Sequence, residues 1–269
     1  MDRNQLFSVR ESLLGPGEPE CRFYRSLVEA KRFIDATSVA SLMDLVFKGK
    51  ENRCSVMESV RDMLHVGFMI SDENLTIAGM SRAAMEARFR WDHFTFESTL
   101  VARELGEFVG LPHVATTVFA AHAAEMNGRA GYVETFIPTE ERNLVRRWME
   151  EEVEIHIGLI LASPSAFATV QNAFQTEGFR IPPFMKGRPI ANYDKGVATI
   201  YYDKLQGNGK LQKRVSLTFH LPILLGNRLA LGPSGVQRRF FRQKSDPNVQ
   251  FDCRAQELMH YSGLRNPTR

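Results

Sequence analysis

The hydrophobic period of the sequence changes at Gly131, and this change constrains the fold more than any other feature. Before it, apolar residues such as Phe23, Leu27 and Phe33 recur every three or four positions, as on one buried face of a helix. After it, the stretch GYVETFI alternates as a strand does, and Pro138 ends the alternation. The sequence therefore predicts helices first and a sheet second.

Four or five successive helices are expected in the first half. The helical pattern covers residues 19–50, 55–70, 80–110 and 112–128. Ser55 is a suitable N-terminal cap for the second of these segments, and Gly110 and Gly128 are suitable C-terminal ends for the last two. These segments together predict a helical layer.

The second half predicts strands that alternate with two helices. A helix begins at Thr139, the largely apolar strand VEIHIGLILA follows, and a second helix runs from Ser163 to Gly178. The runs VATIYYDKL and KRVSLTFHLPILL are joined by a Gly-Asn-Gly turn, which is typical of a hairpin. The expected fold class is α+β: a helical N-terminal part, then a mixed sheet with two helices and a C-terminal hairpin. The expected domains are 1–128, mainly helical, and 129–269, an α+β domain with a basic surface.

Charge is distributed unevenly along the chain. Residues 180–269 carry a net charge of +11 and the first 179 residues a net charge of −8, although the whole chain carries only +3. Such asymmetry suggests an anionic partner. The charge asymmetry is explained equally well if the two halves fold against each other and neutralise each other's charge.

Composition and motifs exclude several classes of protein. The chain is 43% apolar and 24% charged, which is typical of an ordinary globular protein. Its three scattered cysteines argue against a disulfide framework, and we expect a cytoplasmic or intracellular protein without a signal peptide or membrane span. No phosphate-binding loop, dinucleotide fingerprint or zinc-protease motif is present, and His113 and His122 are poorly spaced for a shared metal. The sequence alone assigns no cofactor and no metal.

A basic and aromatic cluster near the C-terminus is the strongest candidate for a binding surface. Because neighbours in a strand face opposite ways, one phenylalanine and at least two cations are expected to share an exposed face. Arginine binds phosphate through its planar fork, and an aromatic ring stacks on an unpaired base or inserts between lipids. The candidate binding residues are Arg238, Arg239, Phe240, Phe241, Arg242 and Lys244, with Lys210, Lys213 and Arg214 on the hairpin.

These features favour a non-enzymatic structural protein over an enzyme. An acidic front and a basic rear allow head-to-tail self-association, which gives a homo-oligomer or a lattice. With a surface for nucleic acid (RNA ahead of DNA) or for an anionic membrane, this describes a capsid, nucleocapsid or matrix protein, possibly viral. The partner stays open between RNA and membrane at this point.

The alternative is an enzyme that uses two histidines. His156 and His220 each lie inside an apolar strand, in EIHIGLIL and LTFHLPIL, and two such histidines in one cleft could act as general base and general acid. The pattern loosely resembles that of the two-histidine phosphoesterases, whose motif is His-x-Thr/Ser. Gly158 and Pro222 stand here at the hydroxyl positions. The resemblance implies phosphodiester chemistry.

Overall fold

The structure is a computed structural model whose chain divides into two units. It describes residues 7–220, with gaps at 71–74, 90–93, 123–131, 140–141, 152–153, 193–196, 208 and 210. The first unit comprises Met1–Ile190 and Thr199–Phe219, and the second comprises Ala191–Ala198 and His220–Arg269. All side chains of the candidate site belong to the first unit.

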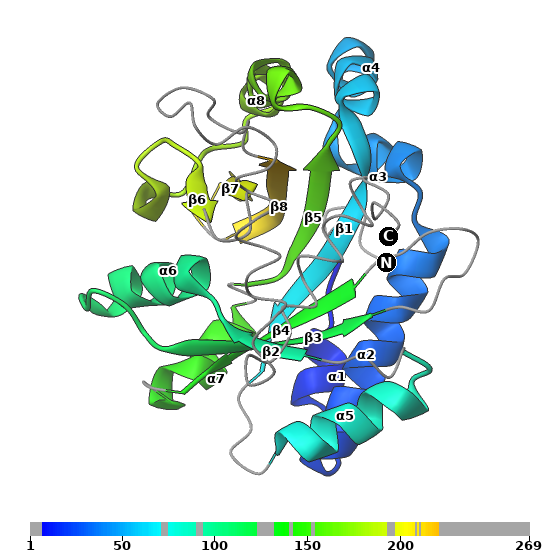
Figure 1. The fold of residues 1–269 in the computed structure, drawn as a ribbon, viewed down its shortest axis with the longest axis vertical. Helices are drawn as coiled ribbons and strands as arrows, with labels where there is room; N and C mark the ends of the chain where they lie inside the picture. Colours follow the sequence, from blue (N-terminus) through cyan, green and yellow to red (C-terminus); the bar gives the residue numbers. More distant parts are fainter. Residues whose placement is uncertain are drawn as a thin grey trace, which may run out of the picture. The chain divides into compact units, whose positions relative to one another are not determined.

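Eight helices and eight strands lie within the described part of the chain (Figure 1). The helices are α1 (Arg10–Leu14), α2 (Pro19–Ala36), α3 (Val39–Val46), α4 (Lys50–Ser59), α5 (Ile77–Glu86), α6 (Thr99–Val109), α7 (Arg142–Glu150) and α8 (Phe167–Thr176). The strands are β1 (Val60–Met69), β2 (Phe94–Glu97), β3 (Thr116–His122), β4 (Tyr132–Pro138), β5 (His156–Leu161), β6 (Ile190–Asn192), β7 (Val197–Leu205) and β8 (Leu211–His220). Two short 3₁₀ turns, η1 (Pro164–Ala166) and η2 (Pro183–Met185), complete the elements. The predicted α+β class is confirmed, and helices α1 to α4 precede the sheet as expected.

The strands form one curled, mixed sheet built from two similar halves. Its order is β2-β3-β4-β1-β5-β8-β7-β6. In each half the first strand is followed by a helix and three further strands, with a second helix, α6, between β2 and β3 in the first half. The first strand of each half pairs in parallel with the last: β1 with β4, and β5 with β8. The halves meet where β1 and β5 pair antiparallel, near the centre of the sheet in Figure 1. The centre of the sheet is therefore the place where equivalent positions of the two halves come together.

One face of the sheet is covered by apolar helix surface. Phe23 of α2 contacts Phe68 of β1 and Phe119 of β3, with ring centroids 6.5 and 6.0 Å apart. Phe174 of α8 stacks on Tyr202 of β7 at 4.9 Å. Since side chains alternate along a strand, the residues next to Phe68 and Tyr202 lie on the opposite face. That second face holds the candidate site.

Several segments predicted as helix are strands. The segment 55–70 is helical only to Ser59, after which β1 runs to Met69, and 112–128 contains β3. The segment 80–110 contains β2 between α5 and α6. The reason is burial: all but two residues of β1 are buried, and a continuous apolar run of this kind fits a central strand and a buried helix equally well.

Other local predictions are confirmed. The hairpin runs through β7 and β8, β5 is central between β1 and β8, and β4 ends at Pro138. Gly110 closes α6 in the left-handed conformation, with φ of 72°. The predicted boundary near Gly128 falls outside the described residues, and the division into domains 1–128 and 129–269 stays a prediction. Strands β1 to β3 precede that boundary and share the sheet with β4 to β8.

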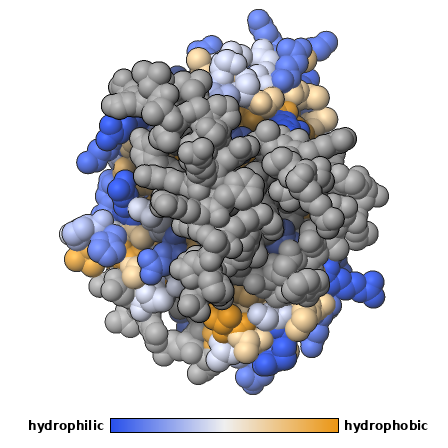
Figure 2. Space-filling model, viewed as in Figure 1, coloured by the Kyte–Doolittle hydropathy of each residue, from blue (hydrophilic) through white to orange (hydrophobic). Residues whose placement is uncertain are grey.

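The surface of the described residues mixes polar and apolar side chains. Figure 2 shows hydrophilic and hydrophobic residues interleaved along the edges of the face drawn. The exposed large apolar side chains are Leu14, Leu45, Met57, Ile77, Met85, Phe108, Leu111 and Leu205, which belong to several different elements. Within the described ranges, no helix is long and apolar enough to cross a lipid bilayer.

Candidate metal-binding site

A short motif occurs twice at the centre of the sheet. His65-Val66-Gly67 lies in β1 and His156-Ile157-Gly158 in β5. The antiparallel register pairs the middle residues with each other and each histidine with the glycine of the other strand. Side chains in register share a face, so both histidines and both glycines lie on the same side of the sheet.

The two glycines make room for the two imidazole rings. A Cβ atom on Gly158 would stand 2.6 Å from Nδ1 and 2.7 Å from Nε2 of His65. A Cβ atom on Gly67 would stand 2.8 Å from Nδ1 of His156. Each ring therefore lies directly over the opposite glycine, a close approach that only glycine allows.

The crossing brings the two histidines together with a carboxylate. Nε2 of His65 lies 2.9 Å from Nε2 of His156, and the rings meet edge to face at 88°. Oε2 of Glu134, on β4 beside Gly67, lies 3.6 Å from Nε2 of His65. One ligand atom from each of the three residues lies within 4.8 Å of the others, a set that could hold a metal ion.

The two facing Nε2 atoms can hydrogen-bond to each other in only one tautomer of His65. Nδ1 of His156 lies 3.0 Å from the carbonyl oxygen of Glu154, so Nδ1 carries the proton and Nε2 presents its lone pair to His65. Nδ1 of His65 has no hydrogen-bond partner among the described residues. If His65 is protonated at Nδ1, two lone pairs face each other at 2.9 Å. If it is protonated at Nε2, it donates to Nε2 of His156; its buried Nδ1 has no partner among the described residues in either tautomer. A cation between the two Nε2 atoms removes the first conflict.

Both imidazoles are held neutral, which suits metal binding. Burial lowers the pKa of His65, and the neighbouring Glu134 carboxylate opposes this only in part. Burial, followed by the adjacent His65, holds the pKa of His156 well below its usual value. Neutral imidazole is the form that coordinates metals, so neither ring has to lose a proton first.

Aromatic side chains surround the pair. Tyr132 of β4 contacts the His65 ring with centroids 5.1 Å apart. Phe136 stacks on His156 at 5.6 Å, and Tyr201 of β7 contacts the same ring at 5.2 Å. Burial, followed by nearby Glu154, raises the pKa of Tyr201 well above its usual value, so its hydroxyl stays neutral. These rings shield the polar centre from water.

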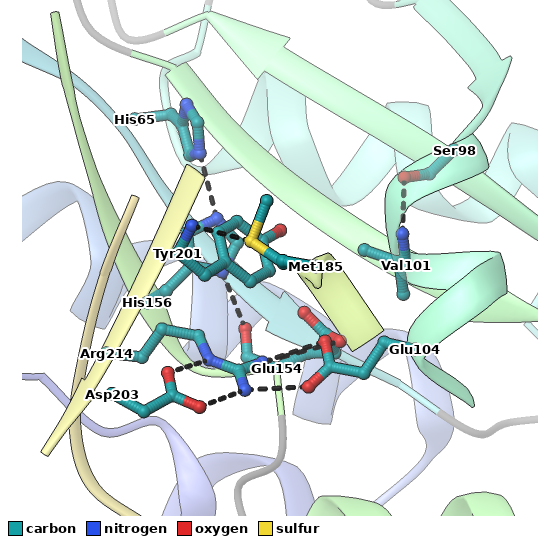
Figure 3. A network of polar contacts seen from close by, with 10 residues as sticks. All are labelled: His65, Ser98, Val101, Glu104, Glu154, His156, Met185, Tyr201, Asp203 and Arg214. Atoms are coloured by element: carbon teal, nitrogen blue, oxygen red, sulfur yellow. Dashed lines mark hydrogen bonds and ion pairs between the residues drawn. The ribbon is translucent and has the colours of Figure 1, made fainter. Parts of the chain in front are cut away.

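A network of buried charges lies behind His156 (Figure 3). Arg214 of β8 is 4% exposed; it donates to both oxygens of Asp203 and of Glu104 and lies 3.7 Å from Glu154. Glu104 comes from α6, whose N-terminus is capped by the Ser98 hydroxyl. Burial, followed by Glu104, raises the pKa of Glu154 well above its usual value, and the neighbouring Arg214 opposes this only in part.

Two of the predicted binding residues are described by the structure, and the others lie outside the described residues. Arg214 is buried in the network just described, and Nζ of Lys213 donates to the carbonyl of Leu45 at 2.7 Å. Lys210 and the cluster Arg238, Arg239, Phe240, Phe241, Arg242 and Lys244 lie outside the described residues. Their role as a binding surface stays untested. The ion pair from Arg214 to Glu104 joins the basic and acidic halves, as neutralisation between the halves requires.

The histidine that lies beside His156 in the first unit is one that the sequence analysis did not name. His220 is the last residue of β8 and belongs to the second unit, and the β5–β8 register ends before it, at Ile160–Thr218. The ring that His156 meets is that of His65. Sequence reasoning missed His65 because it lies in a run interpreted as helix. The repeated His-x-Gly motif was the signal that could have found it.

The comparisons with known proteins identify similar solved structures only. No protein-family model and no curated protein sequence matches the chain. Similar solved structures include a variant of Streptomyces coelicolor methylmalonyl-CoA epimerase in complex with 2-nitronate-propionyl-CoA (17% identity, TM-score 0.39, covering 60% of this chain and 96% of that chain). Another is a methylmalonyl-CoA epimerase in complex with methylmalonyl-CoA and NH₄⁺ (18% identity, TM-score 0.38, covering 61% and 100%).

These findings correct the functional prediction. The similar structures are enzymes with acyl-CoA ligands, and the polar centre of this chain is a buried histidine and carboxylate cluster. The prediction of a non-enzymatic, possibly viral, structural protein that binds RNA or an anionic membrane is therefore wrong. That His156 and His220 share a site stays a prediction. Self-association stays a prediction. With TM-scores below 0.5, the matches assign neither a substrate nor an activity to this chain, whose function has to be argued from its own site.

Proposed function

We propose that the protein is a metal-dependent enzyme whose divalent transition-metal ion is bound by His65, Glu134 and His156. The observation that carries the proposal is the 2.9 Å separation of the two histidine Nε2 atoms, with the Glu134 carboxylate 3.6 Å from one of them. Two histidines and one carboxylate, with further positions open, are the donor set of many catalytic transition-metal sites.

The spacing of the donors fits such an ion. Nitrogens bound at about 2.0–2.1 Å from a metal lie about 2.9 Å apart at right angles and about 3.4 Å apart at a tetrahedral angle. The observed 2.9 Å agrees with the first arrangement. The Glu134 side chain is 14% exposed, so its carboxylate is not locked in the interior and can adjust toward a cation.

The proposed chemistry is Lewis-acid activation of a substrate oxygen. A divalent ion held by two neutral imidazoles and one carboxylate would keep a net positive charge, with which it would polarise a carbonyl or stabilise an oxyanion. The chain's own residues orient the ligands: the rings of Tyr132, Phe136 and Tyr201 pack around the histidines and shield them from bulk water, while the Glu134 side chain stays 14% exposed. In a site of such low polarity the interaction with developing charge is stronger than in water.

Binding of Co²⁺ and Mn²⁺ to metal-free protein tests the proposal. We expect one ion per chain, and we expect His65→Ala, His156→Ala and Glu134→Gln each to weaken Co²⁺ binding by at least about tenfold, or 1.4 kcal/mol. His113→Ala is the matched control, because His113 is exposed and precedes β3 outside the cluster. Water-proton relaxation by bound Mn²⁺ then separates a catalytic site, which keeps exchangeable water on the metal, from a closed structural site. Equal Co²⁺ affinity in all four variants, or no relaxation enhancement, contradicts the proposal.

A further inference from the structure

Arg214 is a buried cation held by carboxylates from three separate segments. Its Nε and Nη2 atoms donate to Asp203 on β7 at 2.7 and 2.8 Å. Its Nη1 and Nη2 atoms donate to Glu104 on α6 at 2.9 and 2.7 Å, and Glu154, just before β5, lies 3.7 Å away. Removing such charges from water costs several kcal/mol per ion, which pairing often only offsets. Stability alone is therefore a weak explanation for this cluster.

The cluster reaches the candidate metal site by two routes. The first is Glu154, whose side chain faces Arg214 and whose carbonyl oxygen accepts the Nδ1–H of His156 at 3.0 Å. The second is Tyr201, because the Arg214 guanidinium lies 5.0 Å from the centre of the Tyr201 ring and that ring contacts His156 at 5.2 Å. Figure 3 shows His156 and Tyr201 between His65 and the charged network. Both residues that contact His156 from this side thus lie beside one guanidinium, although no hydrogen bond joins the Glu154 carboxyl group to it.

We infer that Arg214 is a positioning residue for metal binding. By fixing Glu154 and Tyr201, it holds the His156 ring with Nδ1–H on the Glu154 carbonyl and Nε2 directed at His65. The inference rests on the metal site proposed above. The hydrogen-bond partners of metal-binding histidines fix the tautomer and the ring orientation, and their loss typically weakens metal binding roughly 10- to 100-fold.

Two variants change the contacts between Arg214 and His156 without changing a metal ligand. Arg214→Lys keeps the positive charge but lacks the planar fork that meets two carboxylates at once. Glu154→Ala removes the side chain that faces Arg214 and leaves the carbonyl that accepts from His156. We expect each variant to raise the Co²⁺ dissociation constant about tenfold. Glu154→Gln keeps an oxygen toward Arg214 and is expected to rescue binding to within about threefold of the unchanged protein.

Arg82→Lys is the matched control for the loss of a guanidinium fork. Arg82 forms a two-point ion pair with Glu20 at 3.1 and 2.9 Å, but it is exposed and belongs to α5. Its replacement is expected to leave Co²⁺ binding unchanged. If Arg214→Lys fails to fold, Glu154→Ala and its glutamine rescue still decide the matter.

The tautomer of His156 supplies a measurement that general destabilisation does not alter. In metal-free, ¹⁵N-labelled protein we expect the His156 ring to be protonated at Nδ1 alone, and Arg214→Lys or Glu154→Ala to give a mixture of tautomers. If both variants keep the tautomer and the Co²⁺ affinity while His156→Ala loses binding, Arg214 is not a positioning residue and the metal site stands. If His156→Ala also binds Co²⁺ normally, the metal site itself is wrong.

Discussion

Adding one methyl group at Gly158 or Gly67 tests the crossing of the two histidines without changing any charge. In Gly158→Ala the new Cβ atom would stand 2.6 Å from Nδ1 of His65, and in Gly67→Ala it would stand 2.8 Å from Nδ1 of His156 and 2.9 Å from Cε2 of Phe136. Real Cβ contacts are longer than this, so a ring or a strand has to move. Overpacking of this kind costs about 1–3 kcal/mol of the free energy of unfolding.

Neither ring can move freely. The Nδ1–H of His156 donates to the Glu154 carbonyl, and Tyr201 packs on the same ring. We therefore expect each variant to show two effects. Its free energy of unfolding in urea falls by about 1–3 kcal/mol, and its Co²⁺ affinity falls by at least about tenfold. Both follow from the same steric cause.

Gly207→Ala is the matched control for these two substitutions. A Cβ atom there would meet nothing within 4 Å, and Gly207 is not among the glycines with positive φ. The control therefore reports only the entropic effect of replacing glycine, typically a gain of about 0.4–1 kcal/mol. If Gly158→Ala matches Gly207→Ala in both stability and Co²⁺ affinity, the ring does not lie over Gly158 and the geometry of the site is refuted.

Three further substitutions test the fold outside the cluster of His65, Glu134 and His156. Burial alone would raise the pKa of Glu177, but backbone N–H groups at the start of α4 outweigh it and lower this pKa, so the carboxylate stabilises the fold above its unfolded pKa and loses this effect as the pH falls. Glu177→Gln is accordingly expected to flatten the fall of the melting temperature between pH 7 and pH 3. Ser98→Ala removes the cap of α6 and is expected to cost about 1 kcal/mol in thermal unfolding. Phe174→Ala, on the buried face of α8 against Tyr202 of β7, is expected to cost about 3–5 kcal/mol in urea unfolding, whereas exposed Phe108→Ala should cost little.

The local structure that sequence reasoning predicted correctly has its cause in neighbouring residues of the sequence. The face of α2 that carries Phe23, Leu27 and Phe33 is buried as its spacing predicts. The β7–β8 hairpin follows from its Gly-Asn-Gly turn, in which Gly209 has a φ of 80° that other residues rarely adopt. In both cases the sequence carries a local physical cause.

The site was not predictable by the same reasoning, because its partners are distant in sequence. β1 is buried on both faces, so its apolar run carries no period that separates strand from helix. Arg214 was predicted at a surface, but its counter-charges Glu104 and Asp203 come from α6 and β7 and only the fold brings them together. The net charges of the two halves suggested an anionic partner outside the chain. At least one of the cations counted, Arg214, is instead neutralised by carboxylates of the chain itself.

The repeated His-x-Gly motif supplies the two nitrogen ligands, but it does not by itself make a catalytic site. Two copies of a motif in neighbouring antiparallel strands are related by a local two-fold axis. Each strand therefore contributes one histidine and one glycine to equivalent positions of the site. The carboxylate breaks this symmetry: Glu134 lies beside the first glycine in register, and Ser216 lies at the equivalent place beside the second. Had both been carboxylates, two nitrogens and two oxygens could have closed a four-coordinate site, as in structural metal centres. With a serine on the β8 side, only one half supplies a charged oxygen, so a metal ion held by His65, Glu134 and His156 would keep a position free for an oxygen of a substrate.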